Sequence, residues 1–162
     1  MTSTENGKKL LFSEKVKLEK LSVIIKNHII AQLWQEPVFV LWLDGNLGAG
    51  KTTVVRNILQ QQGLSTATPV VSPTFTYINE YEIAGAWYAH LDLYRLVDNL
   101  KELEELDLAN FLALDYRQYR GFFIEWPLPQ LEKLGLAATH FLKIDMIPGK
   151  NKERNLAFWC GY

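Results

Sequence analysis

The sequence of 162 residues has little that could cross-link or anchor a fold, and each shortage excludes a class of protein. Its one cysteine, Cys160, cannot form an intrachain disulfide, and no group of cysteines and histidines has the spacing of a zinc site. The longest apolar run is far shorter than the roughly 18 residues that a membrane span needs. The N-terminal segment MTSTENGKKLLFSEKVKLEK is too charged for a signal peptide. We therefore expect a protein of the reducing cytoplasm with no membrane association.

The sequence also has almost no net charge, at -1, with 48% hydrophobic and 22% charged residues. These are ordinary globular values, and a chain of this length can bury a substantial core. Without a positive excess it does not hold nucleic acid through bulk electrostatics, so any RNA contact must be local or borrowed from a partner. Since repeats, low-complexity tracts and linkers are absent, we expect one domain over residues 1–162.

Apolar periodicity predicts the elements of the first half of the chain. Leucines and isoleucines recur at helical spacing after Ser13, a possible cap, which predicts a helix from Glu14 to Leu33. The continuous apolar run Val38–Leu43 is typical of a strand buried on both faces of a parallel sheet. Two further elements are expected, a helix at Thr52–Gln62 closed by Gly63 and an extended segment at Thr68–Val71.

The second half of the chain is predicted to be rich in strands. The expected elements are hairpin strands at Thr76–Ile83 and Ala86–Leu93 around Gly85, a helical region at Asn99–Leu114, a strand at Gly121–Glu125, a short helix at Pro129–Leu134, and strands at His140–Ile147 and Asn155–Cys160. Together the elements predict an α/β three-layer sandwich. Its central sheet is mainly parallel and flanked by helices, with antiparallel strands at the margin.

A glycine-rich loop carries the clearest chemical signal. Residues 45–52, GNLGAGKT, fit the pattern G-x-x-x-x-G-K-[ST] between a predicted strand and a predicted helix. In such a P-loop the backbone N–H groups surround an anion, a lysine such as Lys51 reaches the β- and γ-phosphates, and a hydroxyl such as that of Thr52 ligates Mg²⁺. We thus expect a P-loop NTPase-like fold that binds a nucleoside triphosphate with Mg²⁺. The expected nucleotide-binding residues of the motif are Gly45, Asn46, Leu47, Gly48, Ala49, Gly50, Lys51 and Thr52.

A P-loop protein also needs an acidic group at the end of a neighbouring strand to hold the metal ion. Glu125 ends the apolar run GFFIE, and Asp92 ends AWYAHLD. We favour Glu125 as the metal ligand with Thr52, because its strand is the more uniformly apolar and so belongs beside the P-loop. Asp92 could instead cap a helix or pair with Arg95. Lys51, Asp92 and Glu125 are the expected catalytic residues.

Three other features are ambiguous in the sequence. The segment Ser72–Thr76 is rich in hydroxyls and lies where a loop that senses the γ-phosphate is often found, but a plain proline turn has the same composition. The three histidines, His28, His90 and His140, share no spacing and are interpreted as structural. Trp126 is either a recognition residue or a packing residue at a strand end.

Four motifs in series, GNLGAGKTT, SPTF, HLDLYRL and IEWP, resemble the TsaE family, also known as YjeE. The resemblance covers roughly residues 38–127, and the order of the four motifs is more specific than the P-loop alone. It implies a small ATPase needed for threonylcarbamoyladenosine modification of tRNA at adenosine 37. The implied partners are the proteins TsaD and TsaB, which transfer the threonylcarbamoyl group, so tRNA is reached only through that complex.

The resemblance also implies roles for single residues. The ATP site is Gly45 to Thr53, the magnesium ligands are Thr52 and Glu125, Asp92 is a further functional acid, and Trp126 is the tryptophan of the family. Two alternatives to an accessory ATPase stay open. A small-molecule or nucleoside kinase also pairs a P-loop with an acid, although the arginines here form no dense lid segment. A nucleotide-dependent binding switch would show negligible turnover.

Overall fold

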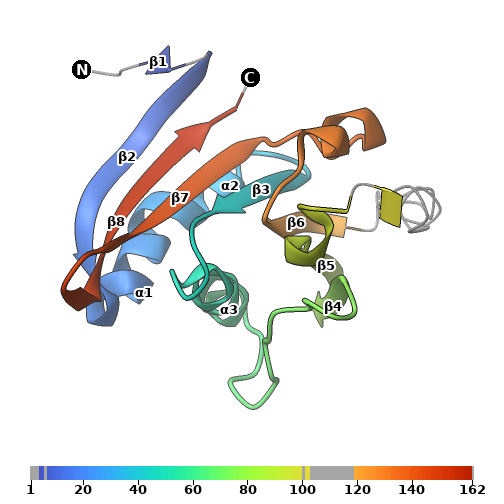
Figure 1. The fold of residues 1–162 in the computed structure, drawn as a ribbon. Coiled ribbons are helices and arrows are strands. Elements are labelled where there is room, and N and C mark those ends of the chain that lie inside the picture. Colours follow the sequence, from blue (N-terminus) through green and yellow to red (C-terminus); the bar gives the residue numbers. More distant parts are fainter. Residues whose placement is uncertain (1–3, 6, 100, 103–118, 162) are drawn as a thin grey trace.

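The computed structural model describes residues 4–5, 7–99, 101–102 and 119–161. Within these residues, eight strands form one mixed sheet in the order β1-β2-β8-β7-β3-β6-β5-β4 (Figure 1). The strand bounds are β1 Thr4–Glu5, β2 Lys8–Lys17, β3 Phe39–Asp44, β4 Ile78–Ile83, β5 Ala86–Asp92, β6 Tyr119–Glu125, β7 His140–Ile147 and β8 Lys150–Cys160.

The centre of the sheet is parallel. Strand β3 pairs in parallel with β6 and with β7, and β6 pairs in parallel with β5. The margins are antiparallel, since β4 pairs with β5 on one side and β8 pairs with β7 and β2 on the other. The predicted α/β arrangement of a parallel core with antiparallel margins is therefore confirmed. It brings the carboxyl ends of β3, β5 and β6 to one edge.

Both faces of the central strands are buried, which explains their continuous apolar sequences. Along β3, Phe39, Leu41 and Leu43 pack on one face, against the helical segment 18–33 and helix α3 (Lys51–Gln61). Val40 and Trp42 pack on the other face, where short 3₁₀-helices at Tyr94–Leu96 and Pro129–Leu134 contribute leucines. The result is the predicted three-layer sandwich (Figure 1).

The predicted helix from Glu14 to Leu33 is wrong in its first turn. Residues up to Lys17 belong to β2, and helical structure begins at Leu18 and runs through α1 (Leu21–Ile24), a π-helical stretch (Ile25–Ile30) and α2 (Ala31–Leu33). Val16 is buried between exposed lysines at 15 and 17, and it pairs with Arg154 of β8. Pairing with β8 therefore sets the structure of these residues, and the strand ends at Lys17, directly before the helical segment.

Thr68–Val71, expected to be extended, is an irregular connection between α3 and β4, and the Val70 carbonyl accepts hydrogen bonds from the Arg56 guanidinium. The predicted hairpin around Gly85 is present, with positive φ at Ala84 and Gly85 as a two-residue turn requires. Most of the helical region expected at 99–114 lies outside the described residues. No helix among the described residues is long and apolar enough to span a membrane.

Candidate nucleotide site

The P-loop connects the end of β3 to the start of α3, and two glycines explain its path. A side chain at Gly45 would place a Cβ 2.4 Å from the Ile144 carbonyl oxygen, so the loop can pass β7 only with glycine there. Gly50, at the helix N-cap, has a φ of 113°, which L-amino acids with a side chain rarely adopt. The loop therefore follows the strand–loop–helix path that the sequence motif predicts.

Arg154 of β8 supports the loop from behind. The residue is 7% exposed, and its guanidinium donates from Nε to the Ala49 carbonyl at 2.8 Å and from Nη2 to the Gly48 carbonyl at 3.4 Å. These bonds point two carbonyl groups of the loop toward the arginine. Such an orientation leaves N–H groups of the same peptide chain available on the other side, where an anion would bind.

Lys51 extends into a cavity beside the loop and is 4% exposed. Its Nζ donates to the carbonyl oxygens of Gly45 at 2.5 Å and Asn46 at 3.2 Å, and lies 4.2 Å from the centroid of the Trp126 ring. Burial lowers the pKa of this ammonium group, and the nearby carboxylates of Glu125 and Asp92 oppose that change. A cation is thus placed where the P-loop motif needs one.

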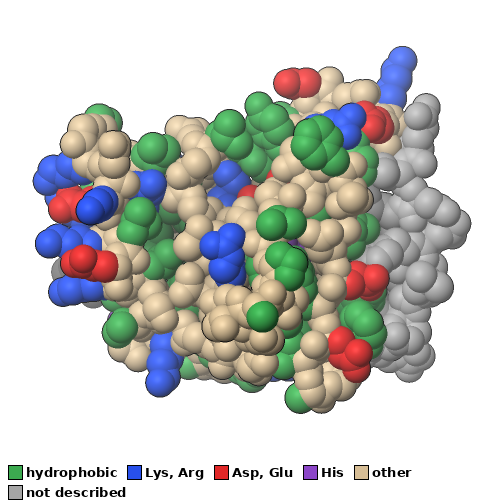
Figure 2. All heavy atoms as spheres, turned by 90° about the horizontal axis from the view of Figure 1, so that it is seen from below, with side chains coloured by type: hydrophobic (Ala, Val, Ile, Leu, Met, Phe, Trp, Pro, Cys, Tyr) green, Lys and Arg blue, Asp and Glu red, His purple; other side chains and the backbone are tan. Residues whose placement is uncertain are grey.

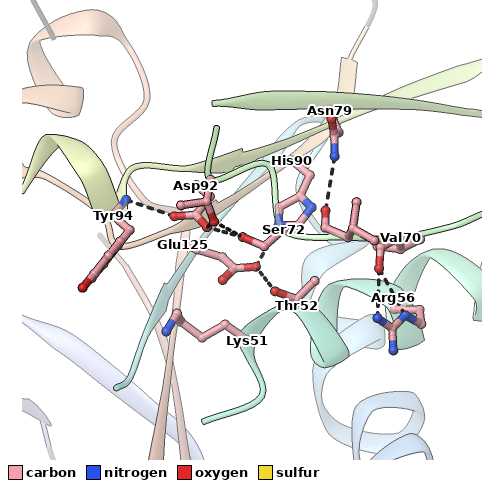
Figure 3. Close-up of polar contacts among 12 residues, drawn as sticks. Lys51, Thr52, Arg56, Val70, Ser72, Asn79, His90, Asp92, Tyr94 and Glu125 are labelled. Carbon is pink, nitrogen blue, oxygen red and sulfur yellow. Dashed lines mark hydrogen bonds and ion pairs between the residues drawn. The ribbon is translucent and has the colours of Figure 1, made fainter. Parts of the chain in front are cut away.

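Thr52 and Glu125 meet at the edge where the parallel strands end. The Thr52 hydroxyl, in the first turn of α3, donates to Glu125 Oε1 at 2.7 Å (Figure 3). Glu125 ends β6, the direct neighbour of β3, and is 3% exposed. No group of three or more acidic, histidine or cysteine side chains in the described residues could hold a metal ion. The oxygens of Thr52 and Glu125 fit Mg²⁺ as a partial ligand set, which phosphate and water oxygens normally complete.

Asp92 lies beside Glu125, at the end of β5, but serves a different set of contacts. Its carboxylate accepts hydrogen bonds from the hydroxyls of Ser72 and Thr74, the latter at 2.7 Å, and from the Tyr94 N–H at 3.0 Å (Figure 3). It therefore fastens the hydroxyl-rich loop to the wall of the cavity and caps the turn that follows. Arg95 does not pair with it here, because its guanidinium lies near the rings of Phe75 and Tyr77.

His90 is the residue of this site that sequence reasoning missed. It is fully buried, and its Nε2 is 2.9 Å from Glu125 Oε1, the same oxygen that accepts from Thr52 (Figure 3). The available signal was its spacing: His90 and Asp92 are two residues apart on β5 and so point to the same face. Asp92 stands opposite Glu125 in the strand register, which puts His90 diagonally across from that carboxylate.

We expect His90 to position Glu125. In His90→Leu the carboxylate loses a donor while staying buried, which costs about 1–3 kcal/mol and should raise the Mg²⁺ concentration for half-maximal ATP hydrolysis at least about fivefold. His90→Gln keeps an N–H donor and should restore most of the Mg²⁺ affinity. A Mg²⁺ titration of both variants, with thermal unfolding to check the fold, makes the comparison. An unchanged Mg²⁺ requirement in His90→Leu would remove the positioning role.

The site as a whole is a cavity of about 350 Å³ at the carboxyl edge of the sheet. Its walls come from three places, the P-loop, the Ser72–Thr74 loop and the strand ends of β5 and β6. Trp126, which follows Glu125 with a φ of 56°, packs against Tyr94 at 5.0 Å between ring centroids and covers one side. The lining residues are Leu47, Gly48, Gly50, Lys51, Thr52, Thr53, Ser72, Thr74, Asp92, Tyr94, Glu125 and Trp126.

Comparison with known proteins identifies the family that has this site. The model of the TsaE family, described as threonylcarbamoyl adenosine biosynthesis protein TsaE, matches residues 16–156. The chain belongs to the TsaE family. The recognition from GNLGAGKTT, SPTF, HLDLYRL and IEWP is therefore confirmed, and it extends beyond the range on which it was based.

Individual relatives agree with this assignment. The chain is 42% identical to the tRNA threonylcarbamoyladenosine biosynthesis protein TsaE of Haemophilus influenzae, over 54% of this chain and 53% of that protein. It is 40% identical to the TsaE protein of Synechocystis, over 57% of each chain. The matches thus span about half the length of these curated relatives. The crystal structure of Bacillus subtilis YdiB shares the fold, with a TM-score of 0.61 and 24% identity over 98% of this chain and 90% of that one.

Proposed function

We propose that this TsaE family member is a Mg²⁺-dependent ATPase that serves the threonylcarbamoyladenosine modification of tRNA together with TsaD and TsaB. The observation that carries the proposal is the 2.7 Å hydrogen bond between Thr52 and Glu125, beside the Lys51 ammonium group and the P-loop. A hydroxyl, a carboxylate and a cation converge there, as a site for a nucleoside triphosphate with its metal requires.

Each group has a task in this proposal. The loop N–H groups bind the phosphates, and Lys51 exchanges its bonds to the Gly45 and Asn46 carbonyls for bonds to phosphate oxygens. Thr52 and Glu125 would hold Mg²⁺, which would supply charge neutralisation for the phosphates. Asp92 and Thr74, already hydrogen-bonded to each other, orient the attacking water.

The nucleoside has room beside the P-loop. A second cavity, of about 220 Å³, shares Gly48, Gly50 and Thr53 with the first and extends toward the start of the helical segment at Leu18 and Ser22. The two cavities therefore adjoin at the P-loop. A nucleotide with its phosphates in the first cavity would extend with its ribose and base toward the second.

The site is short of positive charge for fast hydrolysis. Among the described residues that line the cavity, Lys51 is the single cation, and Arg95 is held near Phe75 and Tyr77 instead. A second cation that stabilises the transition state can be supplied by another protein. Exposed apolar side chains support such a partner, since Leu47, which lines the cavity, is 73% exposed and Phe75, the neighbour of Thr74 in the chain, is 83% exposed.

A partner-dependent ATPase assay tests this proposal. We expect the isolated chain to hydrolyse ATP far below the ~10 s⁻¹ median of enzymes and to accelerate clearly when TsaD and TsaB are added together. The controls omit one partner at a time and include a search for phosphorylated small molecules. Full-speed turnover by the isolated chain, or indifference to both partners, would contradict the accessory role, and a phosphorylated acceptor would favour a kinase.

A further inference from the structure

The near-zero net charge of the chain conceals an uneven distribution. Residues 8–26 and 143–154 contain ten of the 17 lysines and arginines but only four of the 18 acidic residues. The rest of the chain is therefore acidic. The two basic segments lie more than a hundred residues apart in the sequence, so their charges act together only if the fold joins them.

The fold does join them. Strand β2 pairs antiparallel with β8 along its length, with Val16 opposite Arg154 and Lys17 opposite Glu153. The turn between β7 and β8 therefore lies beside the end of β2 and the start of the helical segment. Figure 2 shows lysine and arginine side chains gathered on this side of the molecule, with fewer acidic groups among them. We define the basic surface by its exposed lysines, Lys15, Lys17, Lys20, Lys150 and Lys152.

Ion pairs leave much of this positive charge available. Glu153 is shared by two lysines, at 3.1 Å from Lys15 and 3.3 Å from Lys150, so one carboxylate serves two cations. Lys17, Lys20 and Lys152 have no ion-pair partner among the described residues. Two further acids, Glu14 and Glu19, lie nearby, which leaves the surface with a net positive charge.

The basic surface is hollowed and borders the cavity assigned above to the nucleoside. One hollow, of about 430 Å³, is lined by Lys17, Lys152 and the segment Leu18–Glu19. It shares Leu18 and Glu19 with the cavity assigned above to the nucleoside, and it shares Lys17 and Glu153 with a third hollow that includes Lys15 and Lys20. Hollows that share lining residues lie next to one another, and we call this row of neighbouring hollows, from the nucleoside cavity to Lys15 and Lys20, the groove.

We propose that the basic surface binds the phosphate backbone of RNA along this groove. The inference rests on the proposed function, in which the chain serves a tRNA-modifying complex, and adds a direct contact with the RNA. Lysine ammonium groups are sequence-independent phosphate ligands, and each contact releases counterions from the nucleic acid. A groove fits an RNA strand better than it fits a flat lipid surface. The net charge of -1 permits such a contact because the positive charge is concentrated on this one surface.

Fluorescence anisotropy with a labelled RNA stem–loop, in the absence of ATP, tests the proposal. We expect weak binding by the wild-type chain that falls steeply with salt. Lys17→Gln/Lys152→Gln should weaken it about tenfold at low salt and reduce the slope of log affinity against log salt by about 1.4–1.8. The matched control is Lys101→Gln/Lys133→Gln, which removes the same charge from exposed lysines in the acidic part of the chain, and should change affinity less than threefold.

Three results would overturn the proposal: no salt-dependent RNA binding by the wild-type chain, an equal loss in both double variants, or normal RNA binding by Lys17→Gln/Lys152→Gln with lost binding to TsaD and TsaB. The last would make the surface a docking site for protein. ATP hydrolysis and thermal unfolding of the same variants are measured separately. Failure of the ATPase proposal would appear as absent hydrolysis by the wild-type chain even with TsaD and TsaB present, whereas failure of this inference would appear only in RNA binding.

Discussion

Lys51→Ala is expected to weaken ATP binding by about 10- to 150-fold and to abolish measurable hydrolysis. The side chain supplies charge-assisted hydrogen bonds of about 1.5–3 kcal/mol each, and about 1.4 kcal/mol corresponds to a factor of ten in affinity. Its present acceptors are two P-loop carbonyls and its ammonium group lies over Trp126, so truncation removes no part of either apolar core cluster. Titration with a fluorescent ATP analogue measures the loss.

Lys133→Ala is the matched control, because Lys133 is an exposed lysine on the helix Pro129–Leu134, and it should leave ATP affinity unchanged. Thermal unfolding of both variants separates lost binding from lost folding. If Lys51→Ala stays folded and binds and hydrolyses ATP as the wild type does, the glycine loop is not a nucleotide site.

Glu125→Gln should raise the Mg²⁺ concentration needed for half-maximal hydrolysis by at least about tenfold, whereas Asp92→Asn should lower the maximal rate with little change in the Mg²⁺ requirement. Glu125 contacts the Thr52 hydroxyl at the head of α3, while Asp92 is occupied by Ser72, Thr74 and the Tyr94 N–H. Both changes preserve shape and remove one negative charge, so they are controls for each other. Mg²⁺ titrations of the steady-state rate give both quantities.

A reversed outcome would reassign the two acids. If Asp92→Asn shifts the Mg²⁺ requirement and Glu125→Gln does not, the metal lies nearer β5, and the hydrogen bonds of Asp92 to the Ser72–Thr74 loop must break when it binds.

The predictable parts of the fold are those where sequence pattern and burial agree. Strand β3 is apolar at five consecutive buried positions, and β6 has the buried apolar run Phe122–Ile124 before Glu125. Both strands could therefore be placed in a parallel core from the sequence. The P-loop could be placed because its glycines are required by the backbone path, as the approach of Gly45 to Ile144 shows. In these segments, local sequence and tertiary environment favour the same structure.

Prediction failed where pairing with a distant segment decides the structure. Residues 14–17 form a strand because β8, more than a hundred residues later, pairs with them, and a window along the sequence contains no sign of that partner. The same limit applies to His90. A lone histidine in an apolar strand is usually structural, and only the strand register brings it to Glu125.

The sequence identifies the two candidate acids, but it does not predict the hydrogen bonds that each of them makes. Strand ends at the carboxyl edge of a parallel sheet are where ligands bind, so Asp92 and Glu125 could be named from sequence. Their different partners, Thr52 and His90 for Glu125 but Ser72 and Thr74 for Asp92, depend on side-chain geometry across two strands, the first turn of α3 and a loop. The preference for Glu125 as the metal ligand stays a prediction until metal dependence is measured.

The central claim is that this site binds ATP with Mg²⁺ through the P-loop, Thr52 and Glu125. A crystal structure of the chain with a non-hydrolysable ATP analogue and Mg²⁺ tests it most directly. We expect the β-phosphate within the loop of residues 45–52, the Lys51 ammonium group on phosphate oxygens, and the metal ion on the Thr52 hydroxyl with Glu125 beside it. Phosphates bound away from the loop, or a metal ion held by Asp92 without Thr52 and Glu125, would contradict the account.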